Sequence, residues 1–279
     1  MRIVICLISC CAWIMLIACT EDQEGEVLID QVVTVFEDGF ESAIDDFTDL
    51  FPQDRSRWSN VQVVNSESGE NEIGLSQDIV LSGRNSLRIF SNQSQQTLSK
   101  VDIEKGELNL TEGSMVTIEA NFYITTTSNI KDIFLMDLEC CSCWDPDVAD
   151  NQCPGIRLIM SGDNDFLSIE RGKILEPTIL QADVPFPRNE WVKVKWEMVL
   201  SPEIDGSNKL YINDLLVISS EGINMPNAES FRDEFAKNGI DFQLQEPLFY
   251  ERVQIGVTAN ASLSDIEMYV DDVEIVNVK

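Results

Sequence analysis

The sequence predicts an all-β sandwich of two antiparallel sheets with one short helix. Short stretches rich in β-branched and aromatic residues recur along the 279-residue chain, and Gly, Asn, Asp and Pro clusters separate them. Within these stretches apolar and polar residues alternate with a period of two, as in a strand with one buried face. About 250 residues after the leader can enclose one sizeable core, so one domain is predicted.

Single elements follow from the same patterns. Residues 116–124 and 191–198 alternate strictly, which predicts strands with one apolar face. Residues 162–164 and 205–206 tolerate positive φ and lie between apolar stretches, which predicts two antiparallel hairpins. A helix is predicted from Ala228 to Lys237, where two Phe residues lie four positions apart and an Asn-Gly stop signal follows.

The first 18 residues have the composition of a lipoprotein signal peptide. Arg2 precedes an apolar run that is too short for a comfortable membrane span. Leu16-Ile17-Ala18-Cys19 resembles a bacterial lipobox, so lipidation is predicted at Cys19, and the acyl chains would attach the protein to a membrane. A plain secretory leader is the alternative.

Residues 19–33 are predicted to form an acidic tether to a domain at 34–279. Acidic residues directly after a lipidated cysteine resemble a surface-export signal of Bacteroidota lipoproteins, and an ordinary solvated linker has the same composition. Both interpretations stay open. The expected location is the bacterial cell envelope, as an outer-membrane lipoprotein on the periplasmic or the outward-facing side.

The charge balance excludes several functions. The chain has 49 acidic and 19 basic residues and no histidine, and its formal charge is −30. Catalytic triads with histidine, His-ligated zinc and imidazole acid–base chemistry are therefore excluded. No nucleic-acid partner is expected, because the overall field repels polyanions. Neutral ligands and cations suit such a surface better.

Four cysteines fall close together in the predicted domain. Cys140, Cys141, Cys143 and Cys153 lie within a stretch of 14 residues. In an oxidising envelope compartment this clustering predicts two disulfides, whose pairing the sequence leaves open. The spacing matches no recognised zinc pattern, and a metal site or free thiols are the alternatives.

Five phrases along the chain resemble a known superfamily in their order and spacing. They are Phe36–Ser42, Gly83–Ile89, Trp191–Val194, Asp205–Asp214 and Tyr269–Ile275. Together they are similar to the concanavalin A-like lectin/glucanase superfamily, in particular to its branch of extracellular polysaccharide lyases, over about residues 34–279. The resemblance implies a jelly roll whose first and last strands are adjacent and whose concave sheet binds carbohydrate. It leaves the activity open, because this fold carries lectins, hydrolases, lyases and adhesion modules.

Under this resemblance, acidic residues near both ends of the domain would converge. They are Glu37, Asp38, Glu41, Asp271 and Asp272. Carboxylate oxygens are the ligands that Ca²⁺ prefers, so a structural calcium ion is predicted there. Solvated charges at strand ends are the alternative.

The predicted carbohydrate site consists of polar residues that face outward from their strands. They are Glu119, Asn121, Tyr123, Asp137, Glu139, Arg157, Arg252 and Gln254. Such groups can hydrogen-bond sugar hydroxyls, and a tyrosine can stack on a pyranose. The wet side of a half-buried sheet would look the same. Trp144, in the cysteine loop, is a further candidate as a stacking platform or, alternatively, a hydrophobic lid residue.

No catalytic residue is assigned. Asp137 and Glu139 have the period of the glucanase motif in this superfamily, but Leu135 stands where the nucleophile belongs. Thr258 stands where the resemblance to lyases implies a tyrosine. We therefore expect a lipid-anchored, monomeric protein that binds a carbohydrate, preferably a neutral one, without catalysis. The alternatives are a polysaccharide lyase or degenerate glycoside hydrolase, and an adhesion lipoprotein with a protein partner.

Overall fold

The computed structural model describes residues 32–41, 46–95, 98–126, 128, 130, 132–145, 147, 153–161, 165–171, 179–260 and 263–279. The predicted signal peptide, Cys19, most of the tether and the turn at 162–164 lie outside this range. Among the described residues, no helix is long and apolar enough to cross a membrane.

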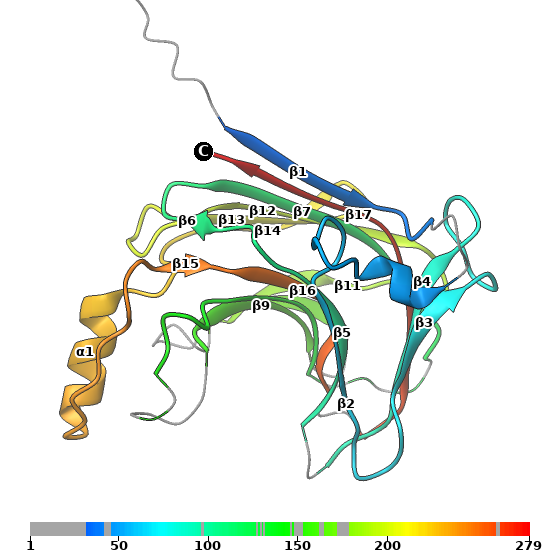
Figure 1. Cartoon of the computed structure of the whole chain (residues 1–279), viewed down its shortest axis with the longest axis horizontal. Coiled ribbons are helices and arrows are strands. Elements are labelled where there is room, and N and C mark those ends of the chain that lie inside the picture. Colours follow the sequence, from blue (N-terminus) through cyan, green and yellow to red (C-terminus); the bar gives the residue numbers. More distant parts are fainter. Residues whose placement is uncertain are drawn as a thin grey trace, which may run out of the picture. The chain divides into compact units, whose positions relative to one another are not determined.

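Two large antiparallel sheets make up the domain (Figure 1). The first sheet has the order β14 (Leu215–Glu221), β13 (Ser207–Ile212), β12 (Val192–Val199), β7 (Met115–Ile124), β17 (Ile266–Val278), β4 (Ser86–Ser91) and β3 (Glu72–Ser76), with β1 (Val33–Asp38) paired to β17. The second sheet has the order β11 (Ile179–Pro185), β10 (Phe166–Glu170), β9 (Gly155–Ser161), β8 (Ile133–Glu139), β16 (Arg252–Asn260), β5 (Ser99–Lys105) and β2 (Asn60–Val64).

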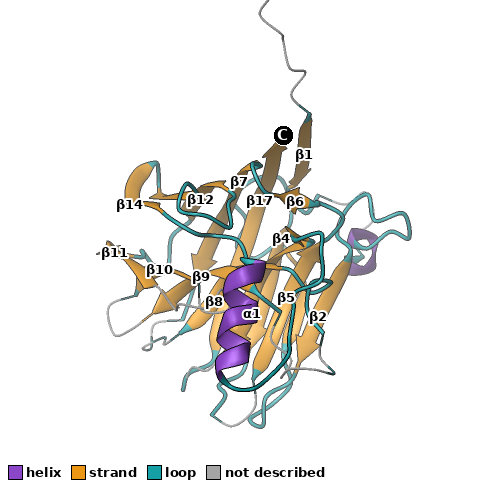
Figure 2. Cartoon of the chain, turned by 90° about the vertical axis from the view of Figure 1, so that its left-hand side faces the viewer, coloured by secondary structure: helices purple, strands orange, loops and turns teal. Residues whose placement is uncertain are grey.

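Four smaller elements complete the described part. They are the paired short strands β6 (Leu110–Thr111) and β15 (Phe249–Tyr250), the 3-10 helix η1 (Phe47–Leu50) and the helix α1 (Ala228–Lys237). The side chain of Asn227 accepts a hydrogen bond from the amide of Ser230 and caps α1, which lies outside both sheets (Figure 2). The helix begins at Ala228 and ends at Lys237, as predicted.

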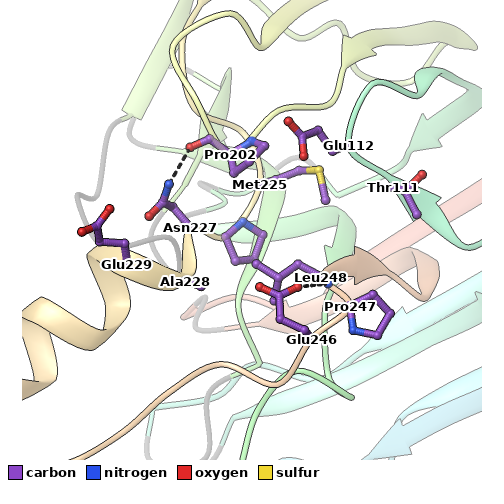
Figure 3. Close-up of a pocket in the computed structure, with 11 residues that line it drawn as sticks. Thr111, Glu112, Pro202, Met225, Asn227, Ala228, Glu229, Glu246, Pro247 and Leu248 are labelled. Atoms are coloured by element: carbon purple, nitrogen blue, oxygen red, sulfur yellow. Dashed lines mark hydrogen bonds between the residues drawn. The ribbon is translucent and has the colours of Figure 1, made fainter.

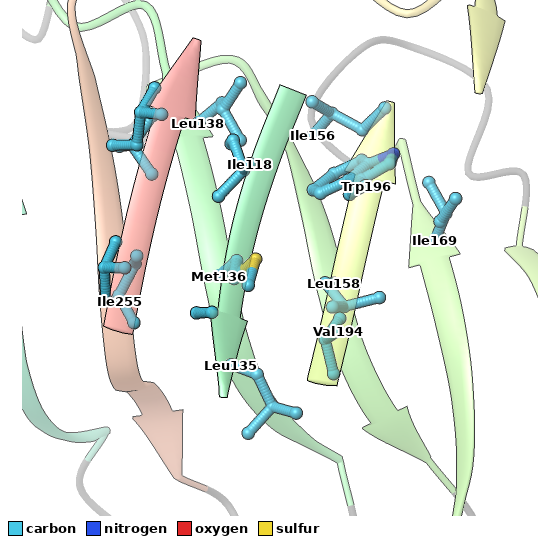
Figure 4. Packing of buried hydrophobic residues seen from close by; sticks show 14 of the residues in the cluster. Ile118, Leu135, Met136, Leu138, Ile156, Leu158, Ile169, Val194, Trp196 and Ile255 are labelled. Atoms are coloured by element: carbon cyan, nitrogen blue, oxygen red, sulfur yellow. The ribbon is translucent and has the colours of Figure 1, made fainter. Parts of the chain in front are cut away.

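The fold prediction is confirmed. The predicted strands at 116–124 and 191–198 are β7 and β12, and both predicted hairpins pair as antiparallel neighbours, as β9 with β10 and β12 with β13. The first and last strands lie side by side, since β1 pairs with β17 along its full length. The apolar faces of both sheets form one core (Figure 4), in which Ile118 and Trp196 of the first sheet join Met136, Leu138 and Ile255 of the second.

A β-bulge changes the phase of β8. Between Phe134 and Met136 this strand has one residue more than its partner β9, which pairs Ile159 with Phe134 and Leu158 with Met136. A bulge reverses the alternation of side chains on the strand that carries it. Leu135, Met136 and Leu138 are accordingly all buried, while Phe134 is only half-buried.

Candidate functional site

A row of polar residues crosses the second sheet. Strand pairing aligns, in order, Asn60, Glu104, Gln254, Asp137, Arg157 and Glu170. In the neighbouring row Arg252 is paired with Glu139. Side chains at paired positions share one face of a sheet, and the residues between them on the same strands belong to the core. The row therefore lies on the face that points away from the core.

Arg157 is held by two carboxylates. Its Nε lies 3.3 Å from Oδ2 of Asp137 and its Nη1 lies 3.7 Å from an oxygen of Glu170. Its guanidinium also lies over the ring of Phe134, at 4.8 Å from the ring centroid. A buried arginine must be paired, and these contacts fix its position.

Arg252 is held in the same way. Its Nη2 donates to Oε2 of Glu139 at 3.0 Å and to Sγ of Cys141 at 2.8 Å, and its Nη1 lies 3.4 Å from Oε1 of Glu104. That oxygen of Glu104 also accepts hydrogen bonds from the side-chain amides of Gln62 and Gln254. Both arginines therefore belong to one polar network with the sheet's carboxylates.

A pocket of about 540 Å³ lies over this network, and its volume is typical of sites for small ligands. Four predicted residues line it, namely Asp137, Glu139, Arg157 and Arg252. The other lining side chains include Gln62, Lys100, Phe134, Cys153 and Thr258. The fifth predicted residue of this sheet, Gln254, is fully buried in the network beside the pocket.

Burial perturbs two carboxyl groups of this sheet. It raises the pKa of Asp137 well above the usual range, and repulsion from Glu139 adds to this effect, while attraction to Arg157 opposes it. Burial likewise raises the pKa of Asp102, which lies on β5, and repulsion from Glu104 adds to this. Both carboxylate oxygens of Asp102 are buried without a hydrogen-bond partner among the residues described.

Replacing Asp102 with Asn is expected to raise the melting temperature at pH 8 and to leave it unchanged at pH 3. A raised pKa means that the native state holds this proton more tightly than the unfolded state. The associated stability is complete below about pH 4 and is lost as the pH rises towards the native pKa. Because the buried charge is removed, the free energy of unfolding at pH 8 should rise by about 1–3 kcal/mol, and the melting temperature by roughly 2–10 °C.

Thermal unfolding of D102N and of the control D183N, which changes an exposed aspartate of β11, measures this effect. Equal changes for D102N at both pH values would contradict the prediction.

Three predicted site residues lie elsewhere. Glu119, Asn121 and Tyr123 belong to β7 in the first sheet, where Glu119 and Asn121 pair with Lys195 and Lys193 of β12. Their assignment to one face with Asp137 was wrong. Alternation identifies the polar side of a strand, but it does not say to which sheet the strand belongs.

Trp144 is a packing residue. Only 8% of its surface is exposed, and its ring lies 4.6 Å from that of Phe242 and 5.8 Å from that of Phe235 of α1, measured between centroids. The prediction of an exposed stacking platform is therefore wrong, and the alternative of a hydrophobic lid residue fits the structure.

Two disulfides hold the same loop, as predicted: Cys140 is bonded to Cys143, and Cys141 to Cys153. The carboxylate of Glu251 accepts hydrogen bonds from the amides of Cys141 and Ser142, which fixes the loop beside Arg252. Within the described residues, the one group of potential metal ligands close enough to share an ion is Glu139, Cys141 and Cys153. The two sulfur atoms of this group are bonded to each other in the Cys141–Cys153 disulfide, so neither is a thiolate that could bind a metal ion.

Most of the predicted calcium ligands have partners within the protein. The carboxylate of Asp38 accepts hydrogen bonds from the guanidinium of Arg57. Glu41 accepts hydrogen bonds from the backbone amides of Arg84 and Asn85. Asp271 accepts hydrogen bonds from the backbone amides of Leu81 and Ser82. Asp272 accepts from the hydroxyl of Ser82, and Glu37 is exposed. Three members, Glu41, Asp271 and Asp272, thus meet at the loop 81–85.

Calcium stays a prediction at this loop. If the ion is present, EDTA is expected to lower the melting temperature, because a ligand that binds only the native state stabilises it. Added Ca²⁺, but not Mg²⁺, should restore it. An unchanged melting temperature in EDTA would contradict the calcium site.

A second pocket, of about 430 Å³, lies at the N-terminal end of α1 (Figure 3). Its lining combines Met225, Leu248 and three prolines with three glutamates, of which Glu246 accepts a hydrogen bond from the amide of Leu248. It shares no lining residue with the pocket on the second sheet, and no residue of the predicted site lines it.

Comparisons with known proteins agree with the fold. No family model matches the chain, and no curated protein matches its sequence. Among solved structures, it is similar to an endo-β-1,4-glucuronan lyase from the fungus Trichoderma reesei, with a TM-score of 0.56 and 9% identity over 78% of this chain and 90% of that one. The cellulose-induced protein Cip1 matches with a TM-score of 0.54 and 13% identity, and the alginate lyase Aly36B with 0.50 and 9%, each over 86% of this chain and 96% of the other. The chain therefore has the concanavalin A-like jelly-roll fold that these polysaccharide lyases share.

Proposed function

We propose that the pocket on the second sheet binds a neutral oligosaccharide without turning it over. The observation that supports this best is a pocket of about 540 Å³ whose polar lining is fixed in advance by ion pairs. Side chains that are already ordered lose little entropy when a ligand binds, so their hydrogen bonds contribute more to affinity. The alternation of donors and acceptors across the row suits sugar hydroxyls, which both donate and accept.

The charges of the pocket favour a neutral ligand. Arg157 and Arg252 each lie within 4 Å of two carboxylates, so their positive charge is compensated inside the protein. A glycan that carries many carboxylates would also be repelled by the protein, whose net charge is −30.

The placement of the tyrosines supports binding without elimination chemistry. A lyase needs a base for the C5 proton of a uronate, often His or Tyr, and the chain has no histidine. Tyr123, Tyr211 and Tyr269 lie on strands of the first sheet. Tyr250 is fully buried, and its hydroxyl donates to the backbone oxygen of Asn224 at 2.6 Å.

A glycan array followed by calorimetry tests this proposal. Lys100 lines the pocket, and its charge attracts the buried carboxyl groups of Asp102 and Asp137 without a hydrogen bond or close ion pair among the described residues, so K100M should remain folded. We expect K100M to lower affinity about tenfold or more, and the control K209M, on the outer side of β13, to leave it unchanged. Binding to no glycan, with and without Ca²⁺, would refute the proposal.

A polysaccharide lyase is the second candidate. Its support is the fold likeness to glucuronan and alginate lyases together with the ammonium of Lys100 in the pocket. An ammonium there can neutralise a uronate carboxylate. Incubation with glucuronan and alginate, followed by ultraviolet absorbance of unsaturated products, separates the two functions, because a binding protein yields no such product.

We also propose that a lipid on Cys19 anchors the protein to the bacterial envelope. The lipobox-like residues 16–19 and the acidic tether support this. Replacing Cys19 with Ser should release the protein from the membrane fraction and abolish its labelling by a fatty-acid analogue. Membrane retention of the unlabelled variant would refute the anchor.

A further inference from the structure

The pocket on the second sheet has one apolar side. Phe134 and Ala259 line it and are paired partners on β8 and β16, and the exposed Leu98 lines it as well. The same lining also includes polar groups, namely Asp137 and the two arginines of the network. The lining is therefore amphipathic.

The bulge in β8 is the reason that Phe134 belongs to this lining. Met136 and Leu138 are buried in the core, and regular alternation would place Phe134 in the core with them. The extra residue between Phe134 and Met136 puts Leu135 into the core instead, so that Phe134 and Asp137 line the same pocket.

The ring of Phe134 is fixed in this position. The guanidinium of Arg157 lies 4.8 Å from its centroid, and Arg157 is in turn held by Asp137 and Glu170. The ring of Phe134 therefore offers a rigid apolar surface beside groups that bind hydroxyls.

We infer that Phe134 is the stacking platform of the pocket and selects pyranoses whose hydroxyls are equatorial. Such a sugar exposes axial C–H groups on its faces and hydroxyls around its rim. Its face matches the ring of Phe134 and its rim matches the polar side that Asp137 lines. This inference rests on the proposed oligosaccharide binding and assigns the specificity of that site.

The chain offers a matched control for this platform. Phe90 of β4 is also half-buried, and the guanidinium of Arg88 lies 5.9 Å from its ring centroid, but it belongs to the first sheet. Substitutions of Phe90 and Phe134 therefore remove similar contacts within the protein. The difference is that Phe134 lines the pocket and Phe90 does not.

Calorimetric titration with cellotetraose, xylotetraose and mannotetraose tests the inference. We expect Phe134→Ala to lower the affinity for cellotetraose by about tenfold to a hundredfold, Phe134→Tyr to retain it, and Phe90→Ala to leave it unchanged. Mannotetraose, with its axial hydroxyl, should bind the wild type more weakly than cellotetraose. In saturation-transfer NMR the axial ring protons of cellotetraose should receive the strongest transfer, and Phe134→Leu should remove this preference.

The outcomes separate the two claims. If Phe134→Ala binds as well as the wild type, or if Phe90→Ala loses as much affinity, the platform is refuted while the binding function stands. If the wild type binds none of the three tetrasaccharides, or binds mannotetraose as tightly as cellotetraose, the inference is refuted, whereas the neutral-glycan proposal is refuted only if no glycan of the array binds.

Discussion

Replacing Arg252 with Met is expected to lower the free energy of unfolding by about 3–5 kcal/mol. Arg252 lies between Glu104 and Glu139, whose side chains are each only 6% exposed. Methionine keeps most of the apolar stem but removes the charge, so two buried carboxylates would face each other without a cation. Urea unfolding at pH 7 measures the change.

Two further variants make this measurement specific. Arg232→Met on α1 removes an exposed arginine that pairs with Glu229 and Asp233, and it should change stability by less than about 1 kcal/mol. Glu139→Gln combined with Arg252→Met should recover part of the loss, because one of the two charges is gone. A loss below about 1 kcal/mol for Arg252→Met alone would show that the ion pairs do not support the sheet.

Replacing Trp144 with Ala is expected to lower the free energy of unfolding by about 3–5 kcal/mol. The Trp144 ring packs against three phenylalanines, and truncation would leave a cavity between the cysteine loop and α1. Trp144→Phe should cost much less, because the indole nitrogen has no hydrogen-bond partner among the described residues. Thermal and urea unfolding of both variants measure these effects.

Trp191→Ala is the matched control, since Trp191 is half-buried and contacts Tyr123 of the first sheet. It should cost less than Trp144→Ala. Under conditions where Trp144→Ala remains folded, its glycan affinity should equal that of the wild type. A selective loss of affinity without a loss of stability would instead restore Trp144 as a contact of the sugar.

Local sequence patterns were sufficient to predict several elements. The strict alternation at 116–124 and 191–198 corresponds to β7 and β12, because a strand with one buried face must alternate. The helix α1 was predicted from two Phe residues four positions apart and from the Asn-Gly stop signal that follows it. The cysteine spacing predicted two disulfides, but the pairing depended on the folded loop.

The candidate site could be predicted only in part. The sequence identified Asp137 and Arg157 as outward-facing residues, and the pairing of β8 with β9 brings them together. Lys100 was missed although β5 alternates, since no local signal places β5 next to β16. Phe134 was missed because the bulge exists only relative to the register of β9, and a single strand does not contain that information.

The sequence by itself determined that the segments 116–124 and 191–198 become strands with one apolar face, where α1 begins and ends, and that the cysteines bond within one loop. These properties depend on interactions between residues close in the chain. The tertiary structure decided that β7 and β8 belong to different sheets, that Trp144 is covered by α1, and that Phe134 rather than Leu135 lines the pocket. These choices depend on pairing between distant strands, whose free energy arises only when both partners are in place.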